Sequence, residues 1–233
     1  GSENLAEARR LLGLAAEQGH ADAQHTLGVM HRNGEGAPKR LAEARRLFGL
    51  AAEQGNAEAQ YLLGFMHRDG EGGPVDFAEA RRLLGLAAEQ GDANAQNMLG
   101  AMHNSGKGGP VDFTEARRLL GLAAEQGDGR SQCLLGNMHR TGEGGPVDSL
   151  EARRLIGLAA EQGVAEAQYM LGFMHRDGEG GPVGFAEARR LLGLAAEQGD
   201  ADAQCMLGGM HRDGEGGPED LAEARRLFGL AAE

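Results

Sequence analysis

Apolar residues recur along the chain at spacings of three and four, in short segments separated by glycine-rich polar stretches. In residues 57–69 the apolar positions are Ala59, Leu62, Leu63 and Met66. In residues 77–90 they are Ala80, Leu83, Leu84, Ala87 and Ala88. Because a helix turns about 100° per residue, each set falls on one side of a helix. The pattern predicts two amphipathic helices, the second with the broader apolar face.

The stretch that joins these two helices, residues 69–76, contains the residues expected to end one helix and begin the next. Gly70 follows the last apolar turn, and glycine commonly terminates a helix. The second helix is expected to begin after Pro74, with Asp76 as its N-cap. A short turn at Gly91-Asp92 then leads into the next pair.

This helix pair repeats along the whole chain without insertions. The tetrapeptide Glu-Ala-Arg-Arg begins every 36 residues, at Glu7, Glu43, Glu79, Glu115, Glu151, Glu187 and Glu223. A period in the thirties made of two helical segments indicates an array of helix pairs. We therefore predict an all-α fold, an α/α superhelical solenoid of thirteen helices that spans residues 1–233 as one domain. Its parts are a half unit at 3–20 and full units at 21–56, 57–92, 93–128, 129–164, 165–200 and 201–233.

The first and last predicted helices, at about 4–18 and 221–232, are both second helices of a pair. Neither has a polar capping helix beside it, although solenoids normally need one. We expect partial exposure of apolar residues at both ends. These residues are Leu11, Leu12, Leu227, Phe228 and Leu230. The array would then either belong to a longer one or self-associate through its ends.

Each unit also carries a recurring motif. It reads Ala-x-Ala-Gln-x-x-Leu-Gly-x-Met, followed by Gly-x-Gly, Glu-Ala and Ala-Ala-Glu-Gln-Gly. Over residues 3–233 this motif resembles the Sel1-like repeat family, a relative of the tetratricopeptide repeat. The resemblance implies that the first helices line a concave groove. Two features differ from the family: histidine replaces an aromatic residue late in the first helix, and the second helix has Leu, Ile or Phe where large aromatics are frequent.

A glycine lies inside every second helix, as in the pair Gly85-Leu86. Glycine in a helix interior costs about 1 kcal/mol relative to alanine. Either a close approach of two helices or drift of a duplicated unit would account for its recurrence.

Comparison of the six full units separates constant positions from variable ones. With Ala57 as position 1, positions 3, 4, 7, 10 and 11 of the first helix scarcely change, whereas positions 2, 5, 9, 12 and 13 include those that vary most. The second set falls within an arc of roughly 100°. The constant arc is predicted to pack, because every unit meets the same neighbours. The other arc, which we name the variable face, is predicted to be free of that constraint.

Aromatic residues on the variable face favour a binding role over a plain solvated surface. Tyr61 with Phe65, and Tyr169 with Phe173, form pairs four residues apart. Aromatics on an unpacked face are typical of interfaces, and nearby arginines would donate hydrogen bonds to a bound peptide. The predicted protein-binding residues are Tyr61, Phe65, Arg68, Asn97, Arg130, Asn137, Arg140, Tyr169, Phe173 and Arg176, with Arg32 and Arg212 beside them. A face that varies without a ligand is the alternative interpretation.

Titratable residues recur as regularly as the helices do. Histidine occupies position 11 of all six units, as His31, His67, His103, His139, His175 and His211. Successive copies should lie roughly 10 Å apart, too far to share a metal bound at about 2.0–2.1 Å. We interpret them as structural residues, and we interpret the Arg-Arg pairs as a solvated, salt-bridged surface. The Asp-Gly-Glu-Gly-Gly loops and residues 105–109 lack calcium-loop and phosphate-loop spacing and are interpreted as turns.

Composition and charge narrow the function. A net charge of −12 argues against binding to nucleic acid or anionic membrane. No apolar run of about 18 residues is long enough to span a bilayer, so we expect a soluble, cytoplasmic protein. Gly1-Ser2 in place of an initiator methionine is typical of a cloning scar. Cys133 and Cys205 lie two repeats apart, about 20 Å, so we expect no disulfide between them.

These observations favour an adaptor or scaffold that binds a protein or peptide, with no catalytic residues, cofactor or metal. One rival is a cell-wall or β-lactam hydrolase, because some cysteine-rich members of the resembled family are linked to that chemistry. No unit here has the two cysteines that those members pair, and no Ser-x-x-Lys motif is present. Another rival is a consensus-designed scaffold without a natural ligand.

Overall fold

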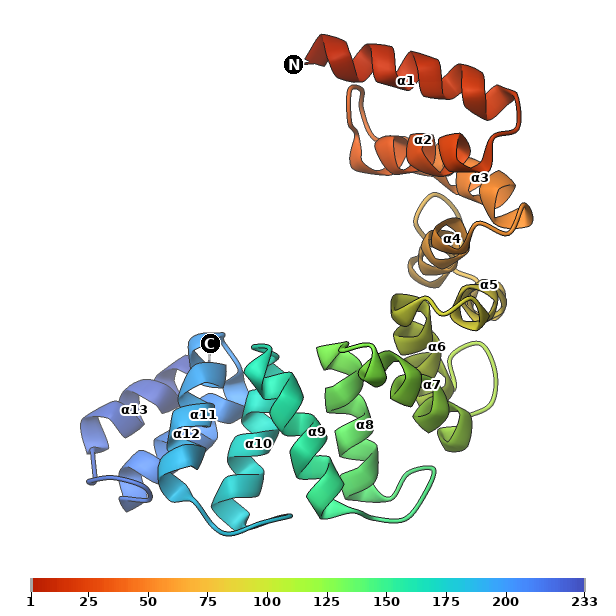
Figure 1. Cartoon of the computed structure of the whole chain (residues 1–233). Helices are drawn as coiled ribbons and strands as arrows, with labels where there is room; N and C mark the ends of the chain where they lie inside the picture. Colours follow the sequence, from red (N-terminus) through yellow and green to blue (C-terminus); the bar gives the residue numbers. More distant parts are fainter. Residues whose placement is uncertain (1, 233) are drawn as a thin grey trace. The chain divides into compact units, whose positions relative to one another are not determined.

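The computed structural model describes residues 2–232, which form helices joined by short turns (Figure 1). This part of the chain contains thirteen α-helices and no β-strand. The predicted all-α fold of paired helices is confirmed.

Contacts between residues group the helices into two compact units that divide within α7 (Phe113–Glu125), after Leu119. In each unit, helices pack on their neighbours in sequence. Before α7, the first unit contains α1 (Ser2–Glu17), α2 (Ala21–Asn33), α3 (Leu41–Glu53), α4 (Ala57–Asp69), α5 (Phe77–Glu89) and α6 (Ala93–Ser105). After α7, the second unit contains α8 (Gly129–Thr141), α9 (Ser149–Glu161), α10 (Ala165–Asp177), α11 (Phe185–Glu197), α12 (Ala201–Asp213) and α13 (Leu221–Leu230).

The turn between α4 and α5 follows the predicted chemistry. Gly70 has a left-handed φ of 73° and donates its N–H to the carbonyl of Met66, which ends α4. Left-handed backbone strains residues with a side chain but not glycine. At the start of α5, Asp76 accepts a hydrogen bond of 3.0 Å from the backbone N–H of Glu79. The predicted helix end and N-cap are both confirmed.

The core lies between successive helix pairs. The five predicted core residues of α5 are all buried, and so are Ala59, Leu63 and Met66 of α4, whereas Leu62 is half-buried. A Cβ atom added to Gly64 would lie 2.9 Å from Cγ of Leu84. The glycine in the first helix therefore lets α4 approach α5 closely.

The recurring glycine of the second helices has a different environment. A Cβ added to Gly85 would meet no atom within 4 Å outside its own helical turn, and the same holds for its counterparts. The close-approach explanation for these glycines is therefore wrong. Gly13 and Gly157 line shallow hollows of about 390 Å³ and about 330 Å³ beside the second helices.

Partial exposure was expected for the apolar residues of α1 and α13, and the structure confirms it for some of them. Leu11, Phe228 and Leu230 are exposed, and Leu12 is half-buried. Leu227 was expected to be exposed, but it is buried in a cluster with Leu192, Leu207 and Met210. The expectation was wrong there because Leu227 lies on the side of α13 that packs against α12.

Candidate functional site

The constant polar residues of the first helix link neighbouring repeats. The side chain of Gln60 is buried and donates to the carbonyl of Ala52 at the end of α3, at 3.1 Å. Its Oε1 atom accepts a bond of 2.8 Å from Gln90, which follows α5. The same two contacts recur through the second unit at Gln168. This glutamine is therefore constant because it satisfies buried backbone groups.

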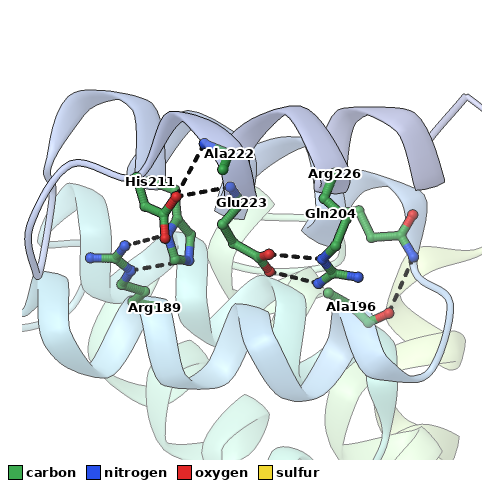
Figure 2. A network of polar contacts seen from close by, with 8 residues as sticks. Arg189, Ala196, Gln204, His211, Ala222, Glu223 and Arg226 are labelled. Atoms are coloured by element: carbon green, nitrogen blue, oxygen red, sulfur yellow. Dashed lines mark hydrogen bonds and ion pairs between the residues drawn. The ribbon is translucent and has the colours of Figure 1, made fainter.

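The histidines pair with arginines of the preceding repeat. Arg45 Nη2 lies 2.7 Å from Nδ1 of His67 and also donates to the carbonyl of Pro74. Figure 2 shows the equivalent pair, Arg189 and His211, in the second unit. Since a guanidinium can only donate, Nδ1 of His67 must be the acceptor, and the proton of its neutral ring lies on Nε2. The structural role predicted for the histidines agrees with this geometry.

Burial and the neighbouring arginine favour the neutral imidazole. Desolvation is the larger cause that lowers the pKa of His67, and the charge of Arg45 lowers it further. Glu79 and Asp76 oppose that shift without reversing it. The pKa values of His31, His103, His175 and His211 are lowered in the same way.

The two arginines of each Arg-Arg pair have different roles. The second, such as Arg46, is exposed and forms an ion pair with Glu43 three residues earlier, at 2.7 Å. Figure 2 shows its counterpart, Arg226 with Glu223. The first, such as Arg45, crosses to the next repeat. Interpreting both as one solvated surface was therefore wrong for the first arginine.

The tyrosines of the variable face are not free of packing, as the sequence interpretation required. Tyr61 is half-buried and packs against the cluster that contains Ala95 and Leu99 of the next repeat. Tyr169 is half-buried beside a similar cluster in the second unit. Burial raises the pKa of the Tyr169 hydroxyl, and Asp202 raises it further. The expectation of an unpacked face is wrong at both rings, because residue 5 of one first helix reaches the following helix pair.

Phe65 lies between two arginines. The guanidinium carbon atoms of Arg32 and Arg68 are 4.8 Å and 4.7 Å from its ring centroid, which is the geometry of a cation–π contact. Phe173, its counterpart in α10, is half-buried. On the variable face, Tyr61 and Tyr169 thus pack against apolar clusters, whereas Phe65 contacts two arginines.

Two arginines at position 12 form ion pairs with a glutamate in the loop that follows the first helix of the next repeat. Arg32 Nε lies 2.7 Å from Glu71, and Arg176 Nε lies 3.0 Å from Glu215. In the repeat that follows Glu71, the equivalent residue is Lys107. Arg68, the arginine that would face it, is paired with its own neighbour Asp69 at 2.6 Å.

The remaining predicted site residues belong to α6 and α8. Asn97 is half-buried in α6, and Arg130 is exposed in the first turn of α8. Asn137 accepts hydrogen bonds of 3.3 Å and 3.0 Å from Arg140. The ten predicted residues therefore lie on first helices of both units, on α4 and α6 in the first and on α8 and α10 in the second.

A hollow of about 360 Å³ opens on the variable face of the second unit, between α10 and α12. Of the predicted residues it contains Tyr169 and Arg176. The other residues that line it are Asp202, Cys205, Met206, Gly209, Met210, Arg212 and Asp213. The sequence interpretation placed several of these on the variable face and took Cys205 as a small side chain that lines the groove, but it did not predict the hollow itself.

Cys133 is not arranged as a catalytic nucleophile. Burial raises the pKa of the Cys133 thiol to about 12, and its sulfur lies 3.8 Å from that of Met170. Cys205 is exposed at the hollow. Among the described residues, no group of three or more His, Cys, Asp or Glu side chains could hold a metal ion. No helix in residues 2–232 is long and apolar enough to cross a membrane.

The repeated helix pairs, with the same contacts recurring between repeats, define an α-helical repeat protein of the solenoid class. The Sel1 repeat profile matches residues 1–20, 21–56, 57–92, 93–128, 129–164, 165–200 and 201–233. The chain therefore belongs to the Sel1 repeat family, whose repeats generally bind protein partners.

Solved structures of Sel1 proteins are similar to the chain. A protective antigen of uropathogenic Escherichia coli has 36% identity and a TM-score of 0.89, over 96% of this chain and 48% of the antigen chain. The chain thus spans about half the length of that protein. A Sel1 repeat protein from Oxalobacter formigenes has 29% identity and a TM-score of 0.83, over 93% of this chain and 86% of the other.

A more distant similarity shows the fold alone. An immunity protein from Pseudomonas aeruginosa has 18% identity and a TM-score of 0.51, over 91% of this chain and 81% of the other. Comparison with curated proteins gave no match.

Proposed function

We propose that the chain is a protein- or peptide-binding adaptor and that the variable face carries the binding site. The observation that supports this most directly is the hollow between α10 and α12, because most of its lining residues, such as Asp202, Cys205 and Gly209, stand at positions that differ between repeats. Pockets of about 300–1,000 Å³ are the usual size of ligand sites. Gln60 and Gln168, which link neighbouring repeats, are by contrast the same in every unit.

The charges at the hollow suit a peptide better than a nucleic acid. Two arginines, Arg176 and Arg212, lie there with two aspartates, Asp202 and Asp213. Such a balanced set can pair with both the carbonyl and N–H groups of a peptide backbone. The net charge of −12 disfavours a polyphosphate partner.

The face can be tested with a displayed random-peptide library selected on the purified chain. The affinity of the selected peptides would be measured by fluorescence anisotropy. We expect Arg212→Glu to weaken binding by about tenfold or more, since Arg212 is an exposed donor at the hollow. Arg225→Glu is the matched control, because it reverses the same charge at an exposed position of α13.

Equal affinity for all variants, including the variable-face changes Arg68→Glu and Arg130→Glu, would contradict the proposal. The adaptor proposal also includes the absence of catalysis. An assay with a chromogenic β-lactam checks this, and hydrolysis of the β-lactam would contradict the adaptor role. Cytoplasmic localisation and end-to-end self-association stay predictions.

A further inference from the structure

We infer that the hollow at Gly209 is a subsite for a single aromatic side chain of a bound peptide, held between Arg176 and Arg212. This inference rests on the proposed function and adds the chemistry of the residue that is bound. Its basis is that the chain fills the equivalent place in its first unit with its own phenylalanine.

Gly209 in α12 and Phe65 in α4 occupy the same position 9, four repeats apart. Two arginines surround each position, at position 12 of the preceding repeat and of the same repeat. Around Phe65 these are Arg32 and Arg68, whose guanidiniums both contact the ring. Around Gly209 they are Arg176 and Arg212, and both line the hollow.

The ion pairs that orient these arginines are also the same. Arg32 pairs with Glu71 of the next loop, as Arg176 pairs with Glu215. Arg68 pairs with the adjacent Asp69 at 2.6 Å, and its counterpart Arg212 pairs with Asp213 at 2.7 Å. A guanidinium held by a carboxylate is available to stack on a ring, because stacking uses its face and the ion pair uses its edge. At Gly209 the arginine frame is therefore present without a ring of the chain's own.

The space left by the ring is open. A Cβ atom added to Gly209 would meet nothing within 4 Å. One turn earlier on the same helix, exposed Cys205 stands where the first unit has the half-buried Tyr61. Arg32, which Phe65 contacts, has 27% of its side chain exposed, whereas Arg176 has 36%. Tyr61 and Phe65 of the first unit thus correspond to the small residues Cys205 and Gly209. The side chain of Arg176 beside them is more exposed than that of Arg32.

The other walls suit an aromatic guest. Met206 and Met210 line the hollow, and thioethers make favourable contacts with aromatic rings while adapting to their shape. Tyr169 forms a further wall, and two aromatic rings attract each other beyond the effect of their buried area. An aliphatic guest would fill the same volume, but it would make neither the cation–π nor the ring–ring contact.

The test uses the whole chain with ¹³C-labelled methionine methyl groups, of which the sequence has nine. The probe is N-acetyl-L-phenylalanine N-methylamide, compared with the leucine derivative. We expect saturable shifts at Met206 and Met210 with a dissociation constant on the order of 1 mM for a ligand of this size. Binding of the leucine derivative should be at least about fivefold weaker.

Gly209→Phe is the decisive variant, because it supplies the ring from the chain itself at a position where the added side chain meets open space. It should abolish the probe shifts while circular dichroism and the melting temperature show a folded chain. Gly209→Ala should keep binding within about twofold, since it adds one methyl group. Gly193→Phe, at a glycine of α11 that is equally open, is the control for adding a phenylalanine elsewhere.

Persistent shifts in Gly209→Phe, equal binding of the leucine derivative, or no shift at Met206 and Met210 would overturn the inference. Peptides from the library separate this failure from that of the adaptor proposal. If Arg212→Glu weakens them and Gly209→Phe does not, the face binds peptides and the aromatic subsite is wrong. If neither variant matters, both proposals are wrong.

Discussion

Arg45 donates from Nη2 to Nδ1 of His67 across 2.7 Å, although the two residues belong to different repeats. Arg45 is always positively charged, and His67 becomes positively charged when it is protonated. The two side chains meet at a contact between successive helix pairs. The same arrangement recurs at Arg9–His31, Arg81–His103, Arg153–His175 and Arg189–His211. Stability of the array therefore depends on the histidines remaining neutral.

Acid should destabilise the chain before its carboxylates protonate. The ordinary pKa of histidine is 6.5, and that of His67 is lowered by desolvation and by Arg45. A lowered pKa in the folded state contributes stability that is fully present above 6.5 and is lost as pH falls through the folded value. Urea midpoints should therefore decrease as pH falls below about 6.5, ahead of a second decrease below about 4.5 as glutamates such as Glu79 protonate.

A histidine variant distinguishes this cause from a general effect of acid. His67→Gln retains an acceptor but does not titrate, so it should reduce the pH dependence between about 6.5 and 5. His20→Gln, at an exposed residue in the turn before α2, is the control and should leave it unchanged. If both variants follow the wild-type curve, the histidines do not contribute to the acid response.

Adjacent arginines should differ in their contribution to stability. Arg45→Met removes hydrogen bonds to His67 and Pro74 in the next repeat and should lower the free energy of unfolding by about 1–3 kcal/mol. Arg46→Met removes an exposed pair with Glu43 and should cost less than about 0.5 kcal/mol. Denaturant titration of both variants measures the difference, and equal effects would contradict the distinction between the two arginines.

The repeat length, the helices and their caps could be predicted because they depend on local chemistry, such as Gly70 and Asp76. The role of Arg45 could not, since its partner lies in the next repeat and the sequence places Arg45 and Arg46 side by side on one helix. One signal in the sequence could have indicated the contact: both His67 and Arg45 recur in the other repeats, as expected of two residues that contact each other in each copy. Tyr61 was misjudged for a related reason: periodicity defines a helix face but not how far a long side chain reaches.

Two glycines of one helix pair should respond in opposite ways to alanine. Gly85→Ala adds a methyl group in open space and should stabilise the chain by up to about 1 kcal/mol through helix propensity. Gly64→Ala places a Cβ 2.9 Å from Leu84 Cγ and 3.3 Å from the carbonyl of Ala80, and should destabilise it by about 1–3 kcal/mol. Thermal melting compares the two, and a stable Gly64→Ala variant would show that α4 and α5 separate easily.

An asparagine of the variable face weakens an ion pair that other repeats form. Asn137 holds Arg140 by two hydrogen bonds, and Arg140 Nη1 is left 3.9 Å from Glu179. The Oε2 atom of Glu179 is buried without a hydrogen bond. At the equivalent pair Arg32–Glu71 the distance is 2.7 Å. The residue at position 9 there is valine, which cannot compete for the arginine.

Asn137→Ala should therefore release Arg140 to pair with Glu179 and stabilise the chain by about 1–2 kcal/mol, since an unsatisfied buried acceptor costs about 1–3 kcal/mol. Alanine also favours helix by a few tenths of a kcal/mol. A double-mutant cycle with Glu179→Gln separates the two effects, because helix propensity is the same in both backgrounds. If the gain from Asn137→Ala is unchanged when residue 179 is glutamine, it comes from propensity and the competition for Arg140 has no energetic weight.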